Sequence, residues 1–511
     1  MEIIDNRAVV LNLRNPERVT TIIPKSKKIG DHKVLVNWGV EEAQVLKNMG
    51  ITIPSPIEGQ YNWTGQHKPY EHQKTTASFL TMHRKAFCFS EMGVGKSATA
   101  IWAADYLLKK GIINRVLVIC PLSIMDSAWR ADLFSFAMHR TVSVAHGARE
   151  KRVRLINEGS DFVIINFDGV GIVSKEVAEG GFDLIIADEC SAYKSPSTNR
   201  WKVLNKLVRP ETWLWMMTGT PAAQSPVDAY GLAKLVNPSG VPRYQTAFKD
   251  QVMFKISTFK WLPKANSKEV VFNALQPAIR FTKDECLDLP EMSYVKRIIE
   301  MTRQQKKYYE HMREKMSMQA AGEQITAANA AVNMNKLLQI SAGAIYTEHG
   351  DALEFDIKHR YKVLREVIDE TSQKTLVFVS FKHVIDILTA KLKADGITTE
   401  VIRGDVTAGN RTRIFKEFQE KEDPRVLVIQ PQSAAHGVTL TAANTVVWWG
   451  PTPSIETYLQ ANARVHRSGQ HHPCTVVQLQ GSKVEEHVYS LLDNKIDVHT
   501  KMIDLYKEIL D

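Results

Sequence analysis

The stretch "SEMGVGKS" (90–97) has the residue types of a loop that binds the phosphates of a nucleotide. Gly93 and Gly95 allow the backbone to bend and to approach a phosphate closely. Successive N–H groups then surround the anion at the positive end of the following helix. In such a loop Lys96 contacts the β- and γ-phosphates, and the Ser97 hydroxyl binds Mg²⁺.

The full pattern GxxxxGK[ST] has a glycine where this chain has Ser90, so a glycine turn beside a surface lysine is the alternative interpretation. The flanking sequence favours the phosphate loop. An apolar "AFCF" precedes it, and a helix is expected to follow through "ATAIWAADYLL" (98–108) and to end at Lys109-Lys110-Gly111. Cations in the last turn and a glycine after it are the usual end of a helix.

A second candidate is the carboxylate pair at the end of "DLIIADEC" (183–190). Carboxylates at the carboxyl end of a parallel strand point into the crevice where ligands bind. We expect Asp188 to hold Mg²⁺, through water, and Glu189 to act as the general base for an attacking water. By itself the pair is equally consistent with a solvated strand end. The phosphate loop upstream favours the interpretation as a site for Mg²⁺ and the attacking water.

The third candidate lies in "PTPSIETYLQANARVHRSGQ" (451–470), which predicts a helix with Thr452 as its N-cap. Gln460, Arg464 and Arg467 are spaced i, i+4 and i+7, so one helical face is expected to carry all three. Two guanidiniums on one face suit a γ-phosphate, because the planar fork of arginine pairs with phosphate oxygens. The alternative is a solvated basic face.

These residues need a rigid scaffold, and two sets of short apolar runs predict one. Runs that are apolar throughout are typical of strands buried on both faces of a parallel sheet. The first set is "RVLVIC" (115–120), "FVIIN" (162–166), "DLIIADE" (183–189) and "WLWMMTG" (213–219), and the second is "TLVFVS" (375–380), "VLVIQ" (426–430), "TVVWW" (445–449) and "TVVQLQ" (475–480). Helical segments separate the runs, so each set predicts a doubly wound α/β domain, at 67–224 and 356–511.

The remaining segments differ in composition. Residues 225–355 contain a long stretch rich in Ala, Met, Gln, Glu and Lys, which predicts a helical protrusion or linker. Residues 1–66 hold proline and glycine clusters and predict a small accessory domain. Its tryptophans, Trp38 and Trp63, are expected to lie in a small core, and stacking on exposed bases of a DNA junction is the less favoured alternative.

Bulk composition narrows the class of protein. The chain has 511 residues, a net charge of +9, and no apolar run of membrane-spanning length. Its five cysteines are far apart, which excludes a CxxC-type zinc site and favours a reducing, cytoplasmic setting. The positive charge suits a polyanionic partner but also fits a mildly basic protein without one.

Taken in order over about residues 67–500, the motifs resemble the Swi/Snf family of superfamily 2 DNA translocases. The matching segments are "KPYEHQ" (68–73), "SEMGVGKS" (90–97), "VLVICPLSIMDSAW" (116–129), "HGARE" (146–150), "VIINFDGV" (163–170), "DECS" (188–191), "MTGTPAAQSPVDAYGLAKLVNP" (217–238), "VFVSFKHVIDIL" (377–388) and "QANARVHRSGQ" (460–470). The last of these is the most specific. Two segments depart from the family: Ser191 replaces a histidine, and "SAAHGVTL" (433–440) keeps little of the usual AGGxGxNL.

The resemblance implies two RecA-like domains that close on ATP and Mg²⁺ and that bind nucleic acid along the strand ends. It assigns Gln73 to the adenine, and it assigns the phosphates and metal to Glu91, Met92, Gly93, Val94, Gly95, Lys96, Ser97 and Asp188. It assigns hydrolysis to Lys96, Asp188, Glu189, Arg464 and Arg467, and coupling to Thr218, Gly219, Thr220 and Gln460. It assigns nucleic-acid contacts to Pro121, Ser123, His146, Gly147, Ser380, Phe381, Gly404, Gly437, Thr439 and Thr441.

The expected function is therefore an ATP-dependent translocase or helicase that acts on duplex or branched DNA, remodelling forks and junctions or displacing bound protein. The chain is expected in the cytoplasm, and association with the nucleoid or with viral replication is compatible with that location. Two alternatives stay open. One is an RNA helicase, because the same two-domain core serves RNA. The other is a nucleotide-dependent binding switch with little motor activity. The departure of segment 433–440 from the family pattern is the reason for this alternative.

Overall fold

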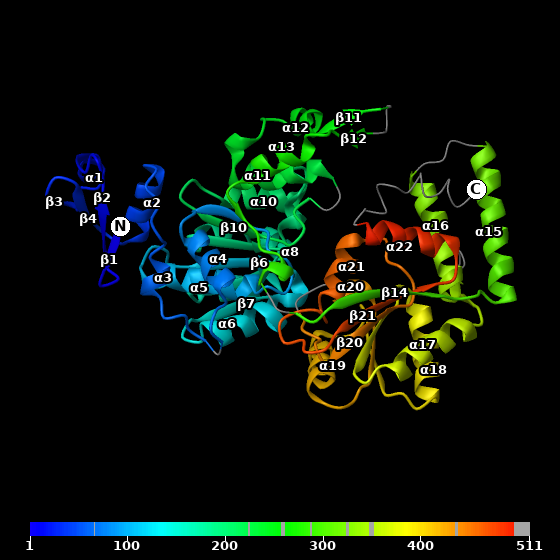
Figure 1. The fold of residues 1–511 in the computed structure, drawn as a ribbon. Helices are drawn as coiled ribbons and strands as arrows, with labels where there is room; N and C mark the ends of the chain where they lie inside the picture. Colours follow the sequence, from blue (N-terminus) through cyan, green and yellow to red (C-terminus); the bar gives the residue numbers. More distant parts are fainter. Residues whose placement is uncertain are drawn as a thin grey trace. The chain divides into compact units, whose positions relative to one another are not determined.

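The computed structural model describes residues 1–65, 67–222, 225–256, 261–286, 289–322, 327–346, 352–434 and 438–494. The chain divides into two compact units, Met1–Cys286 and Leu287–Asp511 (Figure 1). Each unit is built on its own parallel β-sheet, which confirms the expected pair of doubly wound α/β domains.

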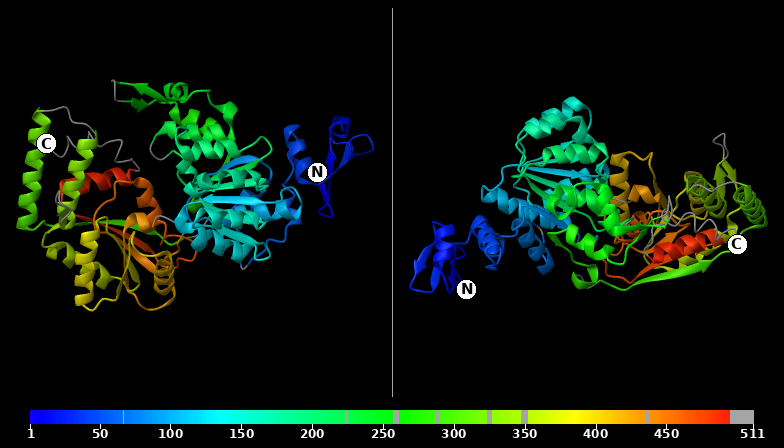
Figure 2. Two further views of the ribbon diagram at one scale, coloured as in Figure 1. Left: turned by 180° about the vertical axis from the view of Figure 1, so that it is seen from behind. Right: turned by 90° about the horizontal axis from the view of Figure 1, so that it is seen from above.

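The first unit contains a seven-stranded sheet in which every neighbouring pair is parallel, in the order β13-β5-β10-β9-β6-β8-β7. The strands are β5 (Lys85–Cys88), β6 (Val116–Cys120), β7 (Val142–Ala145), β8 (Phe162–Asn166), β9 (Leu184–Asp188), β10 (Trp213–Met217) and β13 (Ala278–Ile279). All four apolar runs of the first predicted set form strands. Helices lie on both faces of the sheet (Figure 2).

The helices of this sheet domain are interspersed with the strands along the chain. They are α4 (Glu71–Thr81), α5 (Lys96–Lys109), α6 (Ala131–Phe136), α7 (Arg149–Asn157), α8 (Phe167–Ile172), α9 (Ser174–Glu179), α10 (Asn199–Leu207), α11 (Ala229–Val236), α12 (Gln245–Val252), α13 (Ser267–Ala274) and α14 (Lys283–Cys286). Successive residues of a strand enter different cores: Val118 packs in the cluster of Trp102 on α5, and Leu117 in the cluster of Trp201 on α10. Burial of such side chains contributes about 1.5–3 kcal/mol each.

The amino-terminal segment forms an antiparallel sheet in the order β1-β2-β4-β3 with its own small core. Its elements are β1 (Glu2–Ile4), β2 (Ala8–Asn12), α1 (Glu17–Ile22), β3 (Lys27–Ile29), β4 (Lys33–Asn37), α2 (Val40–Asn48) and α3 (Ile57–Gln60). Trp38 is 2% exposed and donates to the Pro54 carbonyl at 2.9 Å. Trp63 packs edge-on against Tyr61 and Trp102. The prediction of a core residue is confirmed for Trp38, which lies in this small core. Trp63 is half-buried and instead packs against the core of the sheet domain.

The second unit contains a six-stranded parallel sheet in the order β14-β21-β20-β17-β19-β18. Its strands are β14 (Met292–Ile298), β17 (Lys374–Phe378), β18 (Thr399–Ile402), β19 (Val426–Ile429), β20 (Ala443–Trp448) and β21 (Cys474–Gln480). Its helices are α15 (Arg303–Gly322), α16 (Ala327–Ala342), α17 (Lys358–Glu370), α18 (Lys382–Ala394), α19 (Ala408–Glu420), α20 (Pro431–Ala434), α21 (Ile455–Asn462) and α22 (Lys483–Asp493). The second predicted set of strands is confirmed.

The segment 225–355, predicted as one helical protrusion, is shared between the two units. Its long helices α15 and α16 are present as predicted. However, the segment also supplies edge strands to both large sheets, since β13 pairs with β5 and β14 pairs with β21. Two small hairpins accompany them, β11 (Met253–Lys255) with β12 (Trp261–Pro263) and β15 (Ala344–Tyr346) with β16 (Ala352–Glu354). Over the described ranges, no helix combines the length and apolarity that crossing a membrane requires.

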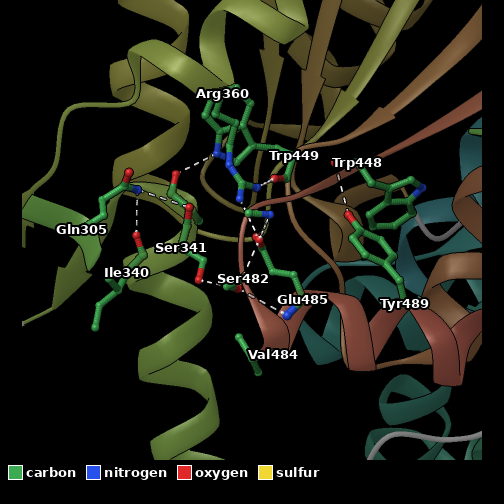
Figure 3. Close-up of polar contacts among 12 residues, drawn as sticks. Gln305, Ile340, Ser341, Arg360, Trp448, Trp449, Ser482, Val484, Glu485 and Tyr489 are labelled. Atoms are coloured by element: carbon green, nitrogen blue, oxygen red, sulfur yellow. Dashed lines mark hydrogen bonds and ion pairs between the residues drawn. The ribbon is translucent and has the colours of Figure 1, made fainter. Parts of the chain in front are cut away.

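A buried polar cluster ties α16 to the sheet of the second unit (Figure 3). Arg360 on α17 donates to Glu485 on α22 at 2.7 Å and also to the carbonyl of Trp449, just after β20. Both ionic side chains are at most 5% exposed. The Ser341 hydroxyl on α16 donates to the Ser482 hydroxyl at 2.8 Å. The cluster therefore joins α16, α17 and α22 at the carboxyl ends of β20 and β21.

Candidate nucleotide-binding and nucleic-acid-contact sites

Apart from Gln73 on α4, the predicted site residues of the first unit follow the carboxyl ends of five strands of one sheet. The phosphate loop follows β5, Pro121 follows β6, His146 follows β7, Glu189 follows β9 and Thr218 follows β10. The carboxyl ends of parallel strands lie at one edge of a sheet, where ligands of open α/β folds bind. The fold therefore brings these segments to a common edge.

The phosphate loop has the backbone that its glycines were expected to provide. Gly93 and Gly95 have φ of +89° and +83°, in the left-handed region that side chains disfavour. A Cβ at Gly95 would lie 2.1 Å from Nε2 of Gln73, so this glycine also allows a close approach. Lys96 begins α5, and its Nζ donates to the carbonyls of Ser90 at 2.9 Å and Glu91 at 3.1 Å. The loop thus curls around its own ammonium group.

Two side chains of α4 hold this loop from behind. Nε2 of Gln73 donates to the Val94 carbonyl at 3.2 Å, and Nε2 of His72 lies 2.9 Å from the same oxygen. Oε1 of Gln73 accepts from the Tyr70 N–H at 3.0 Å. Both ends of the Gln73 amide therefore contact the protein, and its role toward adenine stays a prediction.

Ser90, the departure from the glycine of the general pattern, has a structural reason. Its hydroxyl accepts from the Phe281 N–H at 3.1 Å, and the Glu91 N–H donates to the Phe281 carbonyl at 2.9 Å. The Glu91 carboxylate also accepts from the Lys283 N–H at 3.2 Å. Ser90 therefore fastens the segment after β13 along the phosphate loop. Sequence reasoning missed this contact because the two partners are 191 residues apart.

The carboxylate pair is held in a defined orientation. Asp188 is 8% exposed, and its carboxylate accepts from the Trp129 indole N–H at 2.9 Å and from the Glu189 N–H at 3.0 Å. Glu189 has φ of +52°, which a side chain adopts at a cost and which is typical of functional positions. The Thr218 hydroxyl donates to Glu189 Oε2 at 3.4 Å. Trp129 is a site residue that sequence reasoning did not single out.

The charges of Lys96 and Asp188 both affect the pKa of a buried cysteine thiol, Cys88. Burial raises the pKa of the Cys88 thiol, the Lys96 ammonium opposes that shift, and the Asp188 carboxylate adds to it. Burial raises the pKa of Cys120 as well, again with a contribution from Asp188. Cys88 and Cys120 end β5 and β6, so charges of both signs act on the ends of these strands. The thiols themselves stay protonated at neutral pH.

The predicted coupling segment contacts both groups. The Thr218 N–H donates to the Cys88 carbonyl at 3.2 Å, and the Thr218 hydroxyl accepts from the Thr220 N–H at 3.2 Å. Thr218 is fully buried. A Cβ at Gly219 would lie 3.4 Å from Cγ of Met92 in the phosphate loop. Residues 218–220 thus lie between Glu189 and the loop, and their role in coupling stays a prediction.

The predicted nucleic-acid residues of the first unit differ in exposure. Pro121 is buried, and the Ser123 hydroxyl is buried without a hydrogen-bond partner among the described residues. His146 and Gly147 are exposed, and Gly147 has φ of +105°. Their role in binding stays a prediction.

In the second unit, the predicted helical face for Gln460, Arg464 and Arg467 is wrong. The helix α21 ends at Asn462, and its N-cap is Ser454, whose hydroxyl accepts from the Thr457 N–H, instead of Thr452. Only Gln460 lies on the helix.

Two residues at the end of this helix bond to distant segments. The Asn462 side chain accepts from the indole N–H of Trp448 at 2.9 Å, and the Arg464 carbonyl accepts from the Leu440 N–H at 3.0 Å. The two arginines nevertheless converge. Nη1 of Arg464 and Nη1 of Arg467 donate to the Val438 carbonyl, at 3.4 and 3.1 Å.

The other predicted contacts in the second unit also follow strand ends. Ser380 and Phe381 come after β17, and Gly404, which is exposed, comes after β18. Thr439 is exposed, and the Thr441 hydroxyl accepts from Nε2 of Gln419 at 2.9 Å. Gly437 lies outside the described residues.

The predicted Mg²⁺ site has two protein ligands, Ser97 and Asp188. The residues covered by the structure contain no group of three or more His, Cys, Asp or Glu side chains that could hold an ion. Mg²⁺ in nucleotide sites takes one or two protein oxygens and completes its shell with phosphates and water. Ser97 at the second position of α5 and Asp188 at the end of β9 have the oxygen chemistry for this, and their role stays a prediction.

Comparisons with known proteins agree with this layout. A family model described as SNF2-related domain matches residues 35–345, and one described as Helicase conserved C-terminal domain matches residues 359–469. Similar curated proteins include an uncharacterized ATP-dependent helicase, MG018, of Mycoplasma genitalium (24% identity; 81% of this chain, 40% of that protein) and Chromodomain-helicase-DNA-binding protein 1-like of Mus musculus (26%; 88% and 52%). Putative protein p41 of Acyrthosiphon pisum secondary endosymbiont phage 1 is also similar (24%; 78% and 88%).

The chain therefore spans about two fifths to one half of the length of the first two of these relatives. Among solved structures, a "Sulfolobus solfataricus SWI2/SNF2 ATPase core in complex with dsDNA" aligns with a TM-score of 0.42 and 21% identity, over 86% of this chain and 94% of that one.

Proposed function

The chain belongs to the SNF2-related family and carries a helicase C-terminal domain, and from that premise we propose that it hydrolyses ATP to move along duplex or branched DNA. The observation that carries the proposal is the contact of three segments at one sheet edge: the loop 90–97, the pair Asp188–Glu189 and the segment 218–220. Relatives named ATP-dependent helicases support the same assignment.

In this proposal the first unit binds the nucleotide. The N–H groups of Gly93–Ser97 and the Lys96 ammonium would hold the phosphates. Ser97 and Asp188 would hold Mg²⁺, which would neutralise phosphate charge. Glu189 orients and deprotonates the attacking water. Its left-handed backbone and its contact with Thr218 support the role, because they fix a carboxylate that is otherwise free to rotate.

Completion of the site is assigned to the second unit. Arg464 and Arg467 would stabilise charge on the transferring phosphoryl group, a contribution worth about 10³–10⁵ in rate in comparable systems. Their convergence on the Val438 carbonyl supports a joint role. Coupling of hydrolysis to nucleic acid would run through Thr218, Gly219, Thr220 and Gln460.

Nucleic acid is proposed to contact the strand-end loops of both units. Apart from Pro121, which has neither group, the predicted residues offer N–H or hydroxyl groups and no base-reading side-chain pattern; they are Ser123, His146, Gly147, Ser380, Phe381, Gly404, Gly437, Thr439 and Thr441. Such contacts go mostly to phosphates, so binding is expected to be largely independent of sequence and to weaken with salt. The remodelling of forks, or displacement of bound protein, follows from directional movement.

The test is steady-state ATP hydrolysis with single-stranded, duplex, forked and four-way-junction DNA and with duplex RNA of matched sequence. Duplex or branched DNA should stimulate turnover most. Equal or greater stimulation by RNA would support an RNA helicase instead. Triplex displacement on the same DNA separates a motor from a switch, because a fast ATPase that displaces no strand is a switch.

A further inference from the structure

Arg152, on α7, is a buried arginine whose bonds surround a predicted nucleic-acid loop. It is 6% exposed, and its guanidinium donates to the Ala145 carbonyl at 2.7 Å and to the Gly147 carbonyl at 2.8 Å. These carbonyls lie on either side of His146. The His146 N–H donates to the Val144 carbonyl, so the backbone after β7 is fixed at several points.

A third bond extends this arrangement to the next strand. Nη1 of Arg152 donates to Oδ1 of Asn166 at 3.0 Å. Asn166 is the N-cap residue of α8, yet its side chain does not cap that helix. Asparagine at this position normally bonds the free N–H groups of the first turn. Here the Asn166 side chain accepts from Arg152 instead, and the first turn of α8 has no side-chain cap.

The guanidinium of Arg152 packs so closely against α8 that only glycine fits at position 169. A Cβ at Gly169, in α8, would lie 2.3 Å from Nη1 of Arg152 and 2.6 Å from Oδ1 of Asn166. Glycine is a poor helix former, and its presence within α8 is explained by this close approach. The loop after β7 is thus fixed by one set of contacts, which involves Arg152, Asn166 and Gly169.

We propose that Arg152 is a positioning residue that presents His146 and Gly147 to the nucleic-acid backbone. The inference rests on the proposed function, since it assigns the support of one of its binding loops. Arg152 is buried and does not itself contact the ligand. It acts by holding the loop in a bound-like conformation, which reduces the ordering cost of binding. Its loss should therefore weaken binding much more than it lowers the maximal rate.

Arg115 supplies a matched control in the same unit. It precedes β6, and its guanidinium also donates to main-chain carbonyls, those of Ser160 at 3.1 Å, Ile156 at 2.8 Å and Gly180. However, it lies at the amino-terminal edge of the sheet, away from the strand-end loops. Lysine at either position keeps a cation and removes the planar fork.

The experiment measures ATP hydrolysis against duplex DNA concentration for the wild type, Arg152→Lys, Gly169→Ala and Arg115→Lys in the full chain. Anisotropy of a labelled duplex gives binding directly, and melting temperature gives stability. We expect Arg152→Lys and Gly169→Ala to raise the half-saturating DNA concentration about tenfold, which corresponds to about 1.4 kcal/mol. The plateau rate should change by less than threefold, and Arg115→Lys should leave both DNA parameters near those of the wild type.

Two results overturn the inference while leaving the proposed function intact. The first is a wild-type half-saturating concentration in both Arg152→Lys and Gly169→Ala. The second is the same increase in Arg115→Lys at equal melting temperature, which would reduce the effect to general stability. A wild type that neither binds duplex DNA nor is stimulated by it overturns the proposed function and the inference together.

Discussion

The strand-end loops of the two units reach similar arrangements by different means. In the first unit, side chains bond to one another and to the phosphate loop, as Thr218 does with Glu189. In the second, the two arginines share a main-chain acceptor, the Val438 carbonyl. Any residue except one that distorts the backbone supplies that carbonyl. Segment 433–440 can therefore depart far from its family pattern and still anchor the arginines.

This difference shows where substitutions should matter. In the first unit, identity should matter at both ends of a contact where both ends are side chains, as in the bonds of Thr218 to Glu189 and of Trp129 to Asp188. In the second unit, identity should matter at the arginines and matter little at 438. The four tests below probe that distinction, beginning with the largest expected effect.

The largest effect is expected from the phosphate loop and the acid pair. Lys96→Ala and Glu189→Gln should each lower the rate of ATP hydrolysis by about 10³-fold or more, because they remove phosphate binding and activation of water. Glu189→Gln should still bind a fluorescent ATP analogue, whereas Lys96→Ala should bind it weakly. Lys109→Ala, at the exposed end of the same helix, is the control. Normal hydrolysis in either site variant would remove the catalytic assignment.

The arginines give the next effect and test the second unit. Arg467→Ala should lower kcat by about 10³-fold with little change in ATP affinity, because its charge acts on the transition state. Arg467→Lys should recover part of the rate, since the charge returns without the fork. Val438→Ala keeps the carbonyl and should remain within about threefold of the wild type. A loss of rate in Val438→Ala as large as in Arg467→Ala would contradict the main-chain anchor.

A third test compares stability with chemistry through the buried pair of Arg360 and Glu485. Arg360→Met should destabilise the second unit by about 3–5 kcal/mol, because it leaves a buried carboxylate without its partner. Hydrogen exchange of peptides from β20 and β21 measures this locally. The double variant Arg360→Met/Glu485→Leu removes both charges and should regain most of the loss. If the double variant is as unstable as the single one, packing and not charge explains the effect.

The sequence predicted the sheets better than their edges. Eight apolar runs became strands because residues buried on both faces leave a continuous apolar signal. The edge strand β14 was missed because it is largely exposed, with Tyr294 and Ile298 at 51% and 76%, so it lacks that signal. The expected helix through Arg464 failed for another reason. Around its end, Asn462 and Arg464 bond to Trp448 and Leu440, which periodicity within 451–470 does not contain.

The candidate site follows the same division. Gly93, Gly95 and Lys96 were predictable because a phosphate loop is local: its conformation depends on adjacent residues. Trp129 and Phe281 were not, because their contacts with Asp188 and Ser90 join segments far apart in the chain. Patterns of spacing therefore identify which groups do the chemistry, whereas the groups that orient them emerge only from the fold.

The smallest expected effect concerns Ser90, where the sequence departs from the phosphate-loop pattern. Ser90→Gly and Ser90→Ala both remove the hydroxyl that accepts from the Phe281 N–H, and each should destabilise the first unit by about 1–3 kcal/mol. The rate of hydrolysis should fall by less than about threefold, since Ser90 reaches the site only through its carbonyl, which bonds Lys96 and survives both changes. Ser239→Ala, which removes an exposed hydroxyl bonded to Asn237, is the stability control. A large loss of rate at unchanged stability would instead place the Ser90 hydroxyl among the groups that bind the nucleotide. Catalysis in the first unit would then depend on the side chain of Ser90 as well as on its main-chain carbonyl.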